Sequence, residues 1–578
     1  MTYICAQPDD QPLCSGPAQD EQHAGADAAE TNHQTECLTV LHLVKAVAAH
    51  DTVPSRLYLI TANAQPAPGT QALGVEQAAI WGLGRVIGHQ EFVNQWGGLI
   101  DIDQADDRAE TAARICEHIL TNHPEDQIAI RGRTTFVPRL RRCASLTPAF
   151  PTKLTPDATY VVTGGAGALG RIVATFLAER GARHIALLSR SEIPPRHRWS
   201  SLAADHPHHV MIEAIQKIEH LGARVTTASV DITDAEQVKI WLDEHLRKGG
   251  RPVRGIIHAA GAVDDKLLVN MTESDFTKVM APKTIGTRVL HHTFKEHDLE
   301  FFVMFGSAGS VIASPGQGNY AAANAFLDAF AHHRQAEGLP ALTIGWGPWS
   351  VGMVEELKLE KMYAQRGIEL ITPAAGTRIL DRLINQKTPN VMAISADWMQ
   401  ARRVGLGGQL PPMFCELGTA ETSPDHDQSG LSILDFLSGC PEADRLDVVA
   451  THVRQIVAAV FELAVSDIGS DDALDDIGLD SMMAMDFRLR INSVFGVDLP
   501  LLELLRGVSV NSLAVRILAE LQLAADNPPA VTEQRSEPIP ADDDVDRLLE
   551  QLSEADLRKV LAELEGQSPE QETGEAHL

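Results

Sequence analysis

The sequence lacks the features that mark secreted, zinc-binding and membrane-spanning proteins. Its 7 cysteines are scattered and form no CxxC pair, so neither a zinc site nor a disulfide framework is indicated. No run of about 18 apolar residues occurs, as a membrane-spanning helix requires. The first residues, MTYICAQPDDQ, do not form a signal peptide. These absences favour a location in the reducing cytoplasm.

Positive charge is also scarce. The chain has 48 Lys and Arg against 78 Asp and Glu, which gives a net charge of -30. Nucleic acids and anionic membranes bind basic faces, so neither is expected as a partner. A hydrophobic content of 44% is typical of a globular protein, and 578 residues are too many for one core. We therefore expect several domains.

Composition and periodicity divide the chain into seven segments. Residues 1–37 are polar and are expected to be disordered. Residues 38–150 alternate between helical and strand-like patterns without a glycine-rich phosphate loop. Residues 151–403 also alternate, which predicts an α/β fold with a doubly wound parallel sheet. The other segments are a linker at 404–440, a helical domain at 441–525, a second linker at 526–543 and a helical tail at 544–578.

A glycine-rich loop follows the strand pattern TYVVT. Gly165, Gly167 and Gly170 form GxGxxG, and the helical pattern RIVATFLAERG comes next. Glycine allows a tight turn and a close approach of the backbone to a pyrophosphate, which binds at the N-terminus of the helix. The loop predicts a dinucleotide site with contacts from Gly164, Gly165, Gly167, Leu169 and Gly170, whereas the alternative is a plain tight turn.

The ends of the next strands predict the rest of the nucleotide site. The second strand ends in Ser189 and Arg190, and an arginine at this place suits the 2′-phosphate of NADP, whereas an acid suits NAD. NADPH is therefore the expected cofactor, and the alternative for Arg190 alone is a solvated surface cation. Further contacts are expected from Asp231, Ile232, Ala259, Ala260 and Gly261.

A tyrosine near the start of a helix is the candidate proton donor. Tyr320 and Asn324 are four residues apart and share one helical face, and Ser307 ends the preceding strand FFVMFGS. A free phenol has a pKa of about 10, so Tyr320 needs a nearby cation. Lys283 follows the strand GIIHAAG, and its charge is expected to lower the pKa of the phenol. The alternatives are a strand-end cap for Ser307 and a surface lysine for Lys283.

Together these residues resemble the ketoreductase domain of modular polyketide synthases, a branch of the short-chain dehydrogenase/reductases. In that branch the catalytic lysine and asparagine exchange places relative to the YxxxK enzymes. The residues that fit its order and spacing are Lys283, Ser307, Tyr320 and Asn324. The stretches WGLGR and WGGLIDID resemble the structural subdomain of these reductases, a degenerate Rossmann unit without a cofactor loop. No clear counterpart of that subdomain's first strand and helix precedes Leu38, which points to an incomplete subdomain.

The helical domain contains the stretch GLDSMMAMDFRLRINSVF. Its GLDS resembles the phosphopantetheine attachment motif of acyl carrier proteins, which have DSL where this chain has DSM. The resemblance implies a small all-α four-helix carrier domain with 4′-phosphopantetheine on Ser481, whereas the simpler alternative is a serine that caps a helix. The inner side of the following helix is expected to carry Met482, Met485, Leu489 and Val494.

A short acidic loop bears on stereochemistry. Val263, Asp264 and Asp265 resemble the Leu-Asp-Asp signature of B-type polyketide reductases, with Val in place of Leu. A-type enzymes have a tryptophan eight residues before the tyrosine, where this chain has Ile312. The resemblance implies a loop that steers the substrate arm toward a D-β-hydroxy product. The alternative is that the two aspartates merely solvate a loop.

The resemblance implies an NADPH-dependent reduction of a β-ketoacyl thioester tethered to Ser481. The implied partners are upstream condensing and acyltransferase domains or subunits, a phosphopantetheinyl transferase, and a downstream synthase polypeptide that binds the tail at 544–578. The tail is alternatively a dimer contact or a solvated segment. Two other functions stay open: a carrier scaffold with an inactive reductase-like domain, and a stand-alone fatty-acid reductase.

No metal site is expected. Four histidines cluster in an insertion after Arg190, without convincing ligand spacing, and are interpreted as a solvent-exposed loop. They are His197, His206, His208 and His209. Trp346, Pro348 and Trp349 follow the last core strand and are interpreted as packing residues and pocket wall.

Overall fold

The computed structural model describes most of the chain up to residue 526. The described ranges, apart from short gaps, are residues 2–5, 24–49, 56–143, 152–401 and 411–417, together with parts of 437–526. Residues 527–578, with the expected second linker and helical tail, lie outside the described residues. Among the described helices, none is long and apolar enough to cross a membrane.

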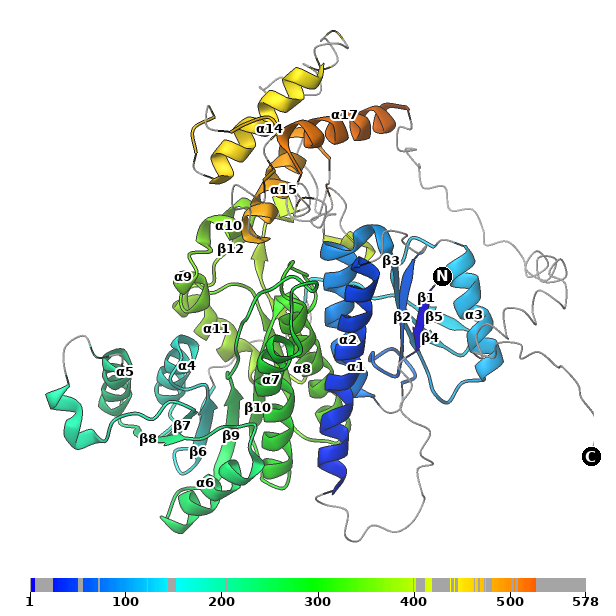
Figure 1. Cartoon of the computed structure of the whole chain (residues 1–578). Coiled ribbons are helices and arrows are strands. Elements are labelled where there is room, and N and C mark those ends of the chain that lie inside the picture. The colour runs from blue at the N-terminus through cyan, green and yellow to red at the C-terminus, as the bar shows by residue number, and fades with distance from the viewer. Residues whose placement is uncertain are drawn as a thin grey trace, which may run out of the picture. The chain divides into compact units, whose positions relative to one another are not determined.

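The first sheet has five strands in the order β1-β2-β3-β4-β5, and all pairs except the last are parallel. The strands are β1 (Thr2–Cys5), β2 (Leu57–Ala62), β3 (Trp96–Ile102), β4 (Gln127–Arg131) and β5 (Thr134–Phe136). The helices are α1 (Ala24–Ala48), α2 (Val75–Val86) and α3 (Arg108–Leu120). We call this unit the structural subdomain (Figure 1).

The expectation of disorder for residues 1–37 is wrong for part of this segment. Strand β1 pairs with β2 in parallel, and α1 begins at Ala24. These elements supply a first strand and a helix that begins before Leu38, where the sequence showed no clear counterpart. The polar composition was misleading because β1 is only 4 residues long and its partner strand begins at Leu57.

The second sheet has seven strands in the order β13-β11-β10-β9-β6-β7-β8, and all of its pairs are parallel. Its strands are β6 (Thr159–Thr163), β7 (His184–Ser189), β8 (Arg224–Ser229), β9 (Val253–His258), β10 (Phe301–Ser307), β11 (Leu342–Trp346) and β13 (Asn390–Ala393). Strands β6 and β11 are buried throughout, as expected where helices cover both faces of a parallel sheet. The predicted doubly wound fold is confirmed.

Helices cover this sheet and leave its carboxyl edge accessible at the point where the strand order reverses, between β6 and β9. They are α4 (Ala168–Glu179), α5 (His209–His220), α6 (Ala235–Arg247), α7 (Glu273–Phe294), α8 (Gly318–Ala336) and α11 (Pro373–Leu383). We call this unit the catalytic subdomain. Figure 1 shows α1 and α2 beside α7 and α8, between the two sheets.

The two subdomains share one hydrophobic core through α2 and α8. Gly82 of α2 lies so close to α8 that an added Cβ would be 2.1 Å from the carbonyl oxygen of Ala321. An ion pair between Arg288 of α7 and Glu76 of α2 also joins the two subdomains. The WGLGR stretch therefore serves close helix packing.

Part of the expected linker at 404–440 is ordered. Residues Pro412–Leu417 form a 3₁₀ helix whose Met413 and Phe414 are buried. The backbone N–H of Leu140 donates to the carbonyl oxygen of Met413 at 2.8 Å. This contact explains why a segment with linker-like composition has a fixed place.

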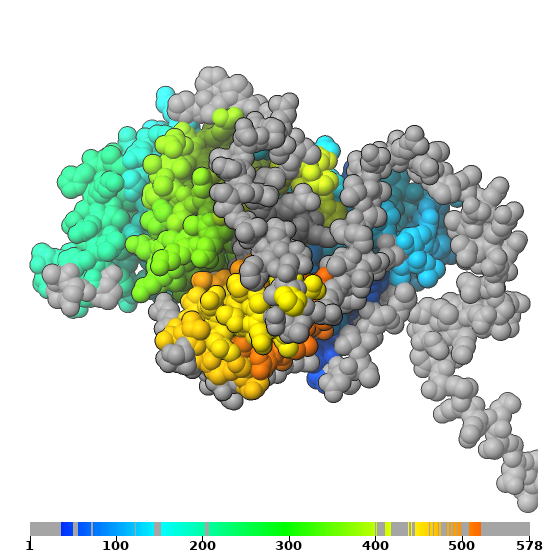
Figure 2. Space-filling view, turned by 90° about the horizontal axis from the view of Figure 1, so that it is seen from above, coloured from blue at the N-terminus to red at the C-terminus, as the bar shows by residue number. Residues whose placement is uncertain are grey.

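The carrier region contains three long helices among its described residues: α14 (Arg445–Phe461), α15 (Ser481–Phe495) and α17 (Val510–Asp526). In Figure 2 its yellow and orange atoms lie together as one packed group. Among the described side chains of α15, the buried apolar ones are Ala484, Phe487, Ile491 and Phe495. The expected inner side was wrong at Val494, which is exposed, because the apolar face is set by the two phenylalanines. The side chains of Met482, Met485 and Leu489 lie outside the described residues.

Candidate active site

The glycine loop lies between β6 and α4, at the carboxyl edge of the second sheet. Gly164 has a φ of 68°, which favours glycine, and a Cβ there would lie 2.8 Å from the carbonyl oxygen of Ala259. A Cβ on Gly170 would lie 2.4 Å from the carbonyl oxygen of Gly164. Gly167 is the N-cap of α4, so the first N–H groups of this helix face the loop. This cradle fits a pyrophosphate, because the glycines allow a close approach of the backbone and the N-terminus of α4 faces the loop.

The residues expected to hold the adenosine half lie at the ends of β7 and β8. Arg190 is exposed directly after β7, and the Ser229 hydroxyl donates to its carbonyl oxygen at 2.9 Å. Ser189 donates through its hydroxyl to the carbonyl oxygen of Ser191 at 3.0 Å. Asp231 accepts from the hydroxyl of Thr233 at 2.7 Å and so fixes the turn after β8. Ile232 follows it and is buried.

One cavity of about 390 Å³ joins the glycine loop to the candidate catalytic residues. The sequence-predicted residues that line it are Gly164, Gly167, Leu169, Gly170, Ala259, Gly261, Val263, Asp265, Lys283, Ser307 and Tyr320. The predicted residues outside its lining are Gly165, Ser189, Arg190, Asp231, Ile232, Ala260, Asp264 and Asn324. The structure thus brings the expected cofactor loop and three of the four candidate catalytic side chains, those of Lys283, Ser307 and Tyr320, to one cavity.

The four candidate catalytic residues lie on three neighbouring elements. Ser307 ends β10, Lys283 lies in α7, and Tyr320 and Asn324 lie one turn apart near the start of α8. Asn324 is fully buried, and its Nδ2 donates to the carbonyl oxygen of Tyr320 at 2.7 Å. The Lys283 Nζ donates to the carbonyl oxygen of Phe305 at 2.7 Å and lies 5.9 Å from the centre of the Tyr320 ring.

Burial, rather than the lysine charge, dominates the acidity of Tyr320. Burial raises the pKa of Tyr320, and a hydrogen bond with the Ser307 side chain only partly offsets this effect. Burial also lowers the pKa of Lys283 to about 8. The net pKa of the phenol is therefore raised in the resting site, not lowered as expected. The phenol instead keeps its proton at neutral pH, which is the state that a proton donor needs.

The acidic loop borders the cavity and is held in place. The carboxylate of Asp264 accepts from Lys278 at 2.9 Å, and that of Asp265 accepts from the amide of Gln317 at 2.9 Å. Val263 and Asp265 face the cavity, as does Ile312 at the position where A-type enzymes have tryptophan. The loop therefore contacts the space that a substrate would occupy.

Glu91 of the structural subdomain connects two loops of the cavity, which no sequence pattern predicted. Its carboxylate accepts from the backbone N–H groups of Leu268 at 2.8 Å and Gly316 at 2.9 Å. Leu268 follows the acidic loop, and Gly316 precedes Tyr320. Burial raises the pKa of Glu91 to about 7, and the two backbone hydrogen bonds oppose the shift.

Aromatic residues form another wall of the cavity. Trp346 and Trp349 are buried against each other with ring centres 5.0 Å apart, and both line the cavity with Pro348. The interpretation of these residues as packing and pocket wall is confirmed. Tyr363, in the short helix α10 (Glu360–Gln365), and Trp398 also line it and were missed, because no recognisable sequence pattern marks them.

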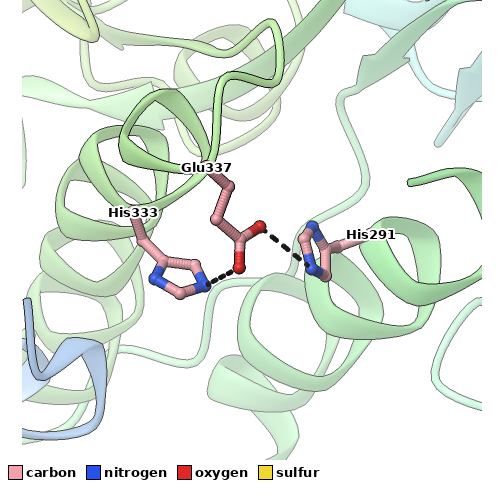
Figure 3. Close-up of side chains that lie close together, drawn as sticks. All are labelled: His291, His333 and Glu337. Atoms are coloured by element: carbon pink, nitrogen blue, oxygen red, sulfur yellow. Dashed lines mark ion pairs between the residues drawn. The ribbon is translucent and has the colours of Figure 1, made fainter. Parts of the chain in front are cut away.

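A different group of side chains has the composition of a metal site. Among the described residues, His291, His333 and Glu337 bring three potential ligand atoms within 4.8 Å of one another (Figure 3). However, Nη1 of Arg334 donates to Nδ1 of His291 at 2.8 Å. The neutral ring therefore carries its proton on Nε2, the nitrogen that faces Glu337. Neither nitrogen of His291 is then free to bind a metal ion, and the nearby Arg334 cation would repel a divalent ion.

The histidine-rich insertion does not gather ligands among its described residues. His206 accepts through Nδ1 from the backbone N–H of His208 at 3.2 Å, and the two rings are 5.4 Å apart. His197 is exposed in a short 3₁₀ helix, and His209 begins α5. The contacts are those of a surface turn.

Three family models match separate parts of the chain. A polyketide synthase extender-module Rossmann-fold domain matches residues 6–140, a KR domain matches residues 158–351, and a phosphopantetheine attachment site matches residues 451–517. The first of these covers the region that contains α1 and β2–β5, and the last contains Ser481.

Among curated proteins, 6-methylsalicylic acid synthase of Aspergillus terreus is 32% identical over 495 residues, which are 82% of this chain and 26% of that protein. A phenolphthiocerol/phthiocerol polyketide synthase protein of Mycobacterium tuberculosis is 30% identical over 86% of this chain and 25% of its own length. The chain therefore spans about a quarter of the length of these relatives.

Solved ketoreductases have the same fold as the reductase part. An A1-type ketoreductase is 31% identical with a TM-score of 0.59, over 66% of this chain and 77% of its own. A C2-type ketoreductase from a modular polyketide synthase is 27% identical with a TM-score of 0.56, over 65% of this chain and 78% of its own.

Proposed function

The chain belongs to the polyketide synthase family, with a ketoreductase domain followed by a phosphopantetheine carrier domain, and from this premise we propose that it reduces a β-ketoacyl thioester to a β-hydroxyacyl thioester with NADPH. The observation that carries the proposal is the single cavity that holds the glycine loop, Lys283, Ser307 and Tyr320 together. The substrate is the acyl chain borne by a phosphopantetheine arm on Ser481.

Ser307 and Tyr320 act on the oxygen of the ketone. When bound, NADPH would supply the hydride for the carbonyl carbon. The Tyr320 hydroxyl gives its proton to the carbonyl oxygen as charge develops there, and Ser307 donates a hydrogen bond to the same oxygen. Because burial keeps Tyr320 protonated, the acid is present in the resting site.

Lys283 and Asn324 support the donor. The Lys283 ammonium lies beside the phenol ring and stabilises the phenolate that proton transfer leaves behind. Asn324 fixes the first turn of α8 through its bond to the Tyr320 carbonyl oxygen. Its Oδ1 is buried without a hydrogen-bond partner, so it is available to accept from a group that returns a proton to the site.

The cofactor half of the site favours NADPH over NADH. Arg190 stands at the end of β7, where the 2′-phosphate of the adenosine ribose would lie. Gly164, Gly165, Gly167, Leu169 and Gly170 would hold the pyrophosphate, and Ser189, Asp231, Ile232, Ala259, Ala260 and Gly261 would complete the contacts.

The acidic loop is proposed to set the product's configuration. Val263 and Asp265 face the cavity, so they exclude the pantetheine arm from one side and present one face of the ketone. The expected product is the D-β-hydroxyacyl thioester, without epimerisation. Chiral chromatography of a reduced diketide thioester tests this, and a predominant L-hydroxy product would refute it.

The carrier and its partners complete the proposal. Ser481 begins α15 within the matched attachment domain, where a phosphopantetheinyl transferase would load it. Upstream condensing and acyltransferase domains or subunits supply the ketoacyl chain, and a downstream synthase polypeptide receives the product. The reaction takes place in the cytoplasm.

The experiment that tests the proposal incubates the full chain with NADPH and a small ketone such as a decalone. Oxidation of NADPH in step with alcohol formation supports the reductase, and its absence supports the inactive scaffold.

A further inference from the structure

Helix α8 carries a third polar residue on the face of Tyr320 and Asn324. Asp328 lies four residues after Asn324 and eight after Tyr320, so the three side chains occupy successive turns of one face. Asp328 is partly buried, and the mechanism described above does not use it. A carboxylate in such a place needs partners, because removing a charge from water is costly.

Ser310 connects Asp328 to the segment that carries Ser307. The Ser310 Oγ lies 2.7 Å from Oδ2 of Asp328 and 3.0 Å from the carbonyl oxygen of Ser307. From the opposite side, Nη1 of Arg85 donates to the Ser310 carbonyl oxygen at 2.7 Å. Ser310 is buried, so both of its polar groups depend on these partners. The loop after Ser307 is thus fixed by α8 and by α2.

The charge of Asp328 also acts on two buried cations. Lys283 and Arg85 are each almost fully buried, and the charge of Asp328 favours the protonated form of both. His258 of β9 is near Lys283 but is neutral, since its ring accepts from Thr163 and donates to the carbonyl oxygen of Pro282. Burial raises the pKa of Asp328 to about 6, so it is ionised at neutral pH.

We propose that Asp328 is a positioning residue of the reductase: it holds the Ser307 loop through Ser310 and places a negative charge on the face of α8 that carries Tyr320 and Asn324. The inference rests on the proposed reduction. It differs from a purely structural role because it links Asp328 to the pH range in which Lys283 acts.

The direction of the pH effect follows from the charges. Lys283 is a cation below its pKa, so activity that needs the ammonium is retained at lower pH and lost as the pH rises. Asp328 raises that pKa; its removal lowers it. The alkaline limb of the activity profile should therefore move to lower pH in Asp328→Asn.

The test measures kcat and KM against pH for the full chain with NADPH and a soluble ketone. Asp328→Asn removes the charge but keeps the shape, and Ser310→Ala removes the hydroxyl but keeps the charge. Asp243→Asn, at a residue of α6 outside the site, is the matched control. We expect a lower kcat with a displaced alkaline limb for Asp328→Asn, a lower kcat with an unmoved limb for Ser310→Ala, and the parent profile for the control.

An Asp328→Asn profile with an unmoved limb would overturn the charge role, and unchanged kcat in both variants would overturn the inference entirely. If Asp328→Asn does not fold, Ser310→Ala still tests the positioning role. A parent-like kcat in Ser310→Ala contradicts that role. A parent chain that oxidises no NADPH contradicts the proposed function itself, and this result is separate from any difference between variants.

Discussion

At the scale of single residues, the candidate site depends on groups whose proton affinities are set by burial. Tyr320 keeps its proton because its surroundings disfavour the phenolate, and Lys283 sits near the boundary of protonation because its surroundings disfavour the ammonium. Opposite shifts of an acid and a cation within one cavity are suited to proton transfer near neutral pH. The carboxylate of Asp328 restores part of the positive charge at Lys283.

The choice of cofactor is tested at Arg190. Replacing it with alanine should raise the Kd for NADPH by about tenfold or more while leaving NADH unchanged, because only NADPH has the 2′-phosphate and a charge-assisted hydrogen bond contributes on this scale. Arg198→Ala, another exposed arginine of the same segment, is the control. Equal weakening of both cofactors in a fluorescence titration would remove Arg190 from the site.

At the scale of elements, the position of the tyrosine helix depends on the structural subdomain. Helix α2 contacts α8 at Gly82, Arg85 of α2 holds the Ser310 carbonyl, and Glu91 binds the loops around the cavity. A subdomain without a cofactor loop therefore has a defined task, which is to hold α8 and its flanking loops.

Substitutions at two glycines of α2 test whether the structural subdomain holds α8 in place. Gly82→Ala should destabilise the protein by about 1–3 kcal/mol and lower kcat, because its Cβ would meet the backbone of α8, which cannot move aside. Gly84→Ala is matched in helix and residue type, but its Cβ would meet only the flexible side chain of Leu99. Urea unfolding of the two variants should rank Gly82→Ala as the less stable, and equal stabilities would contradict close packing at Gly82.

The sequence predicted the elements that carry local patterns. The glycine loop between β6 and α4, Ser307 at the end of β10, and Tyr320 with Asn324 on one turn of α8 are all visible in short stretches. The contacts of Glu91 with Gly316 and of Arg85 with Ser310 each join residues 225 positions apart. No local periodicity reports such pairings, and for the same reason the parallel pairing of β1 with β2 was missed.

At the scale of the whole molecule, the reductase and the carrier lie on one chain. In the proposed reaction, tethering would raise the effective concentration of the substrate at the cavity, so a carrier-bound ketone would need little intrinsic affinity. The chain covers only about a quarter of the length of the two curated relatives.

The carrier role is tested by Ser481→Ala. Incubation with coenzyme A and a phosphopantetheinyl transferase should add the arm to the parent chain and leave the variant unmodified, because the acceptor hydroxyl is lost. Intact-mass spectrometry measures the change. The variant should still reduce a soluble ketone at the parent rate, and a modified variant would place the arm on another serine.

The central claim is that this chain reduces a β-keto group with a proton from Tyr320. Its most direct test is NADPH oxidation by the full chain with a soluble β-ketoacyl thioester, compared between the parent and Tyr320→Phe. The account predicts turnover in the parent, a loss of kcat of at least about 10²-fold in the variant, and equal NADPH affinity in both. Retained turnover in Tyr320→Phe, or none in the parent, would contradict it.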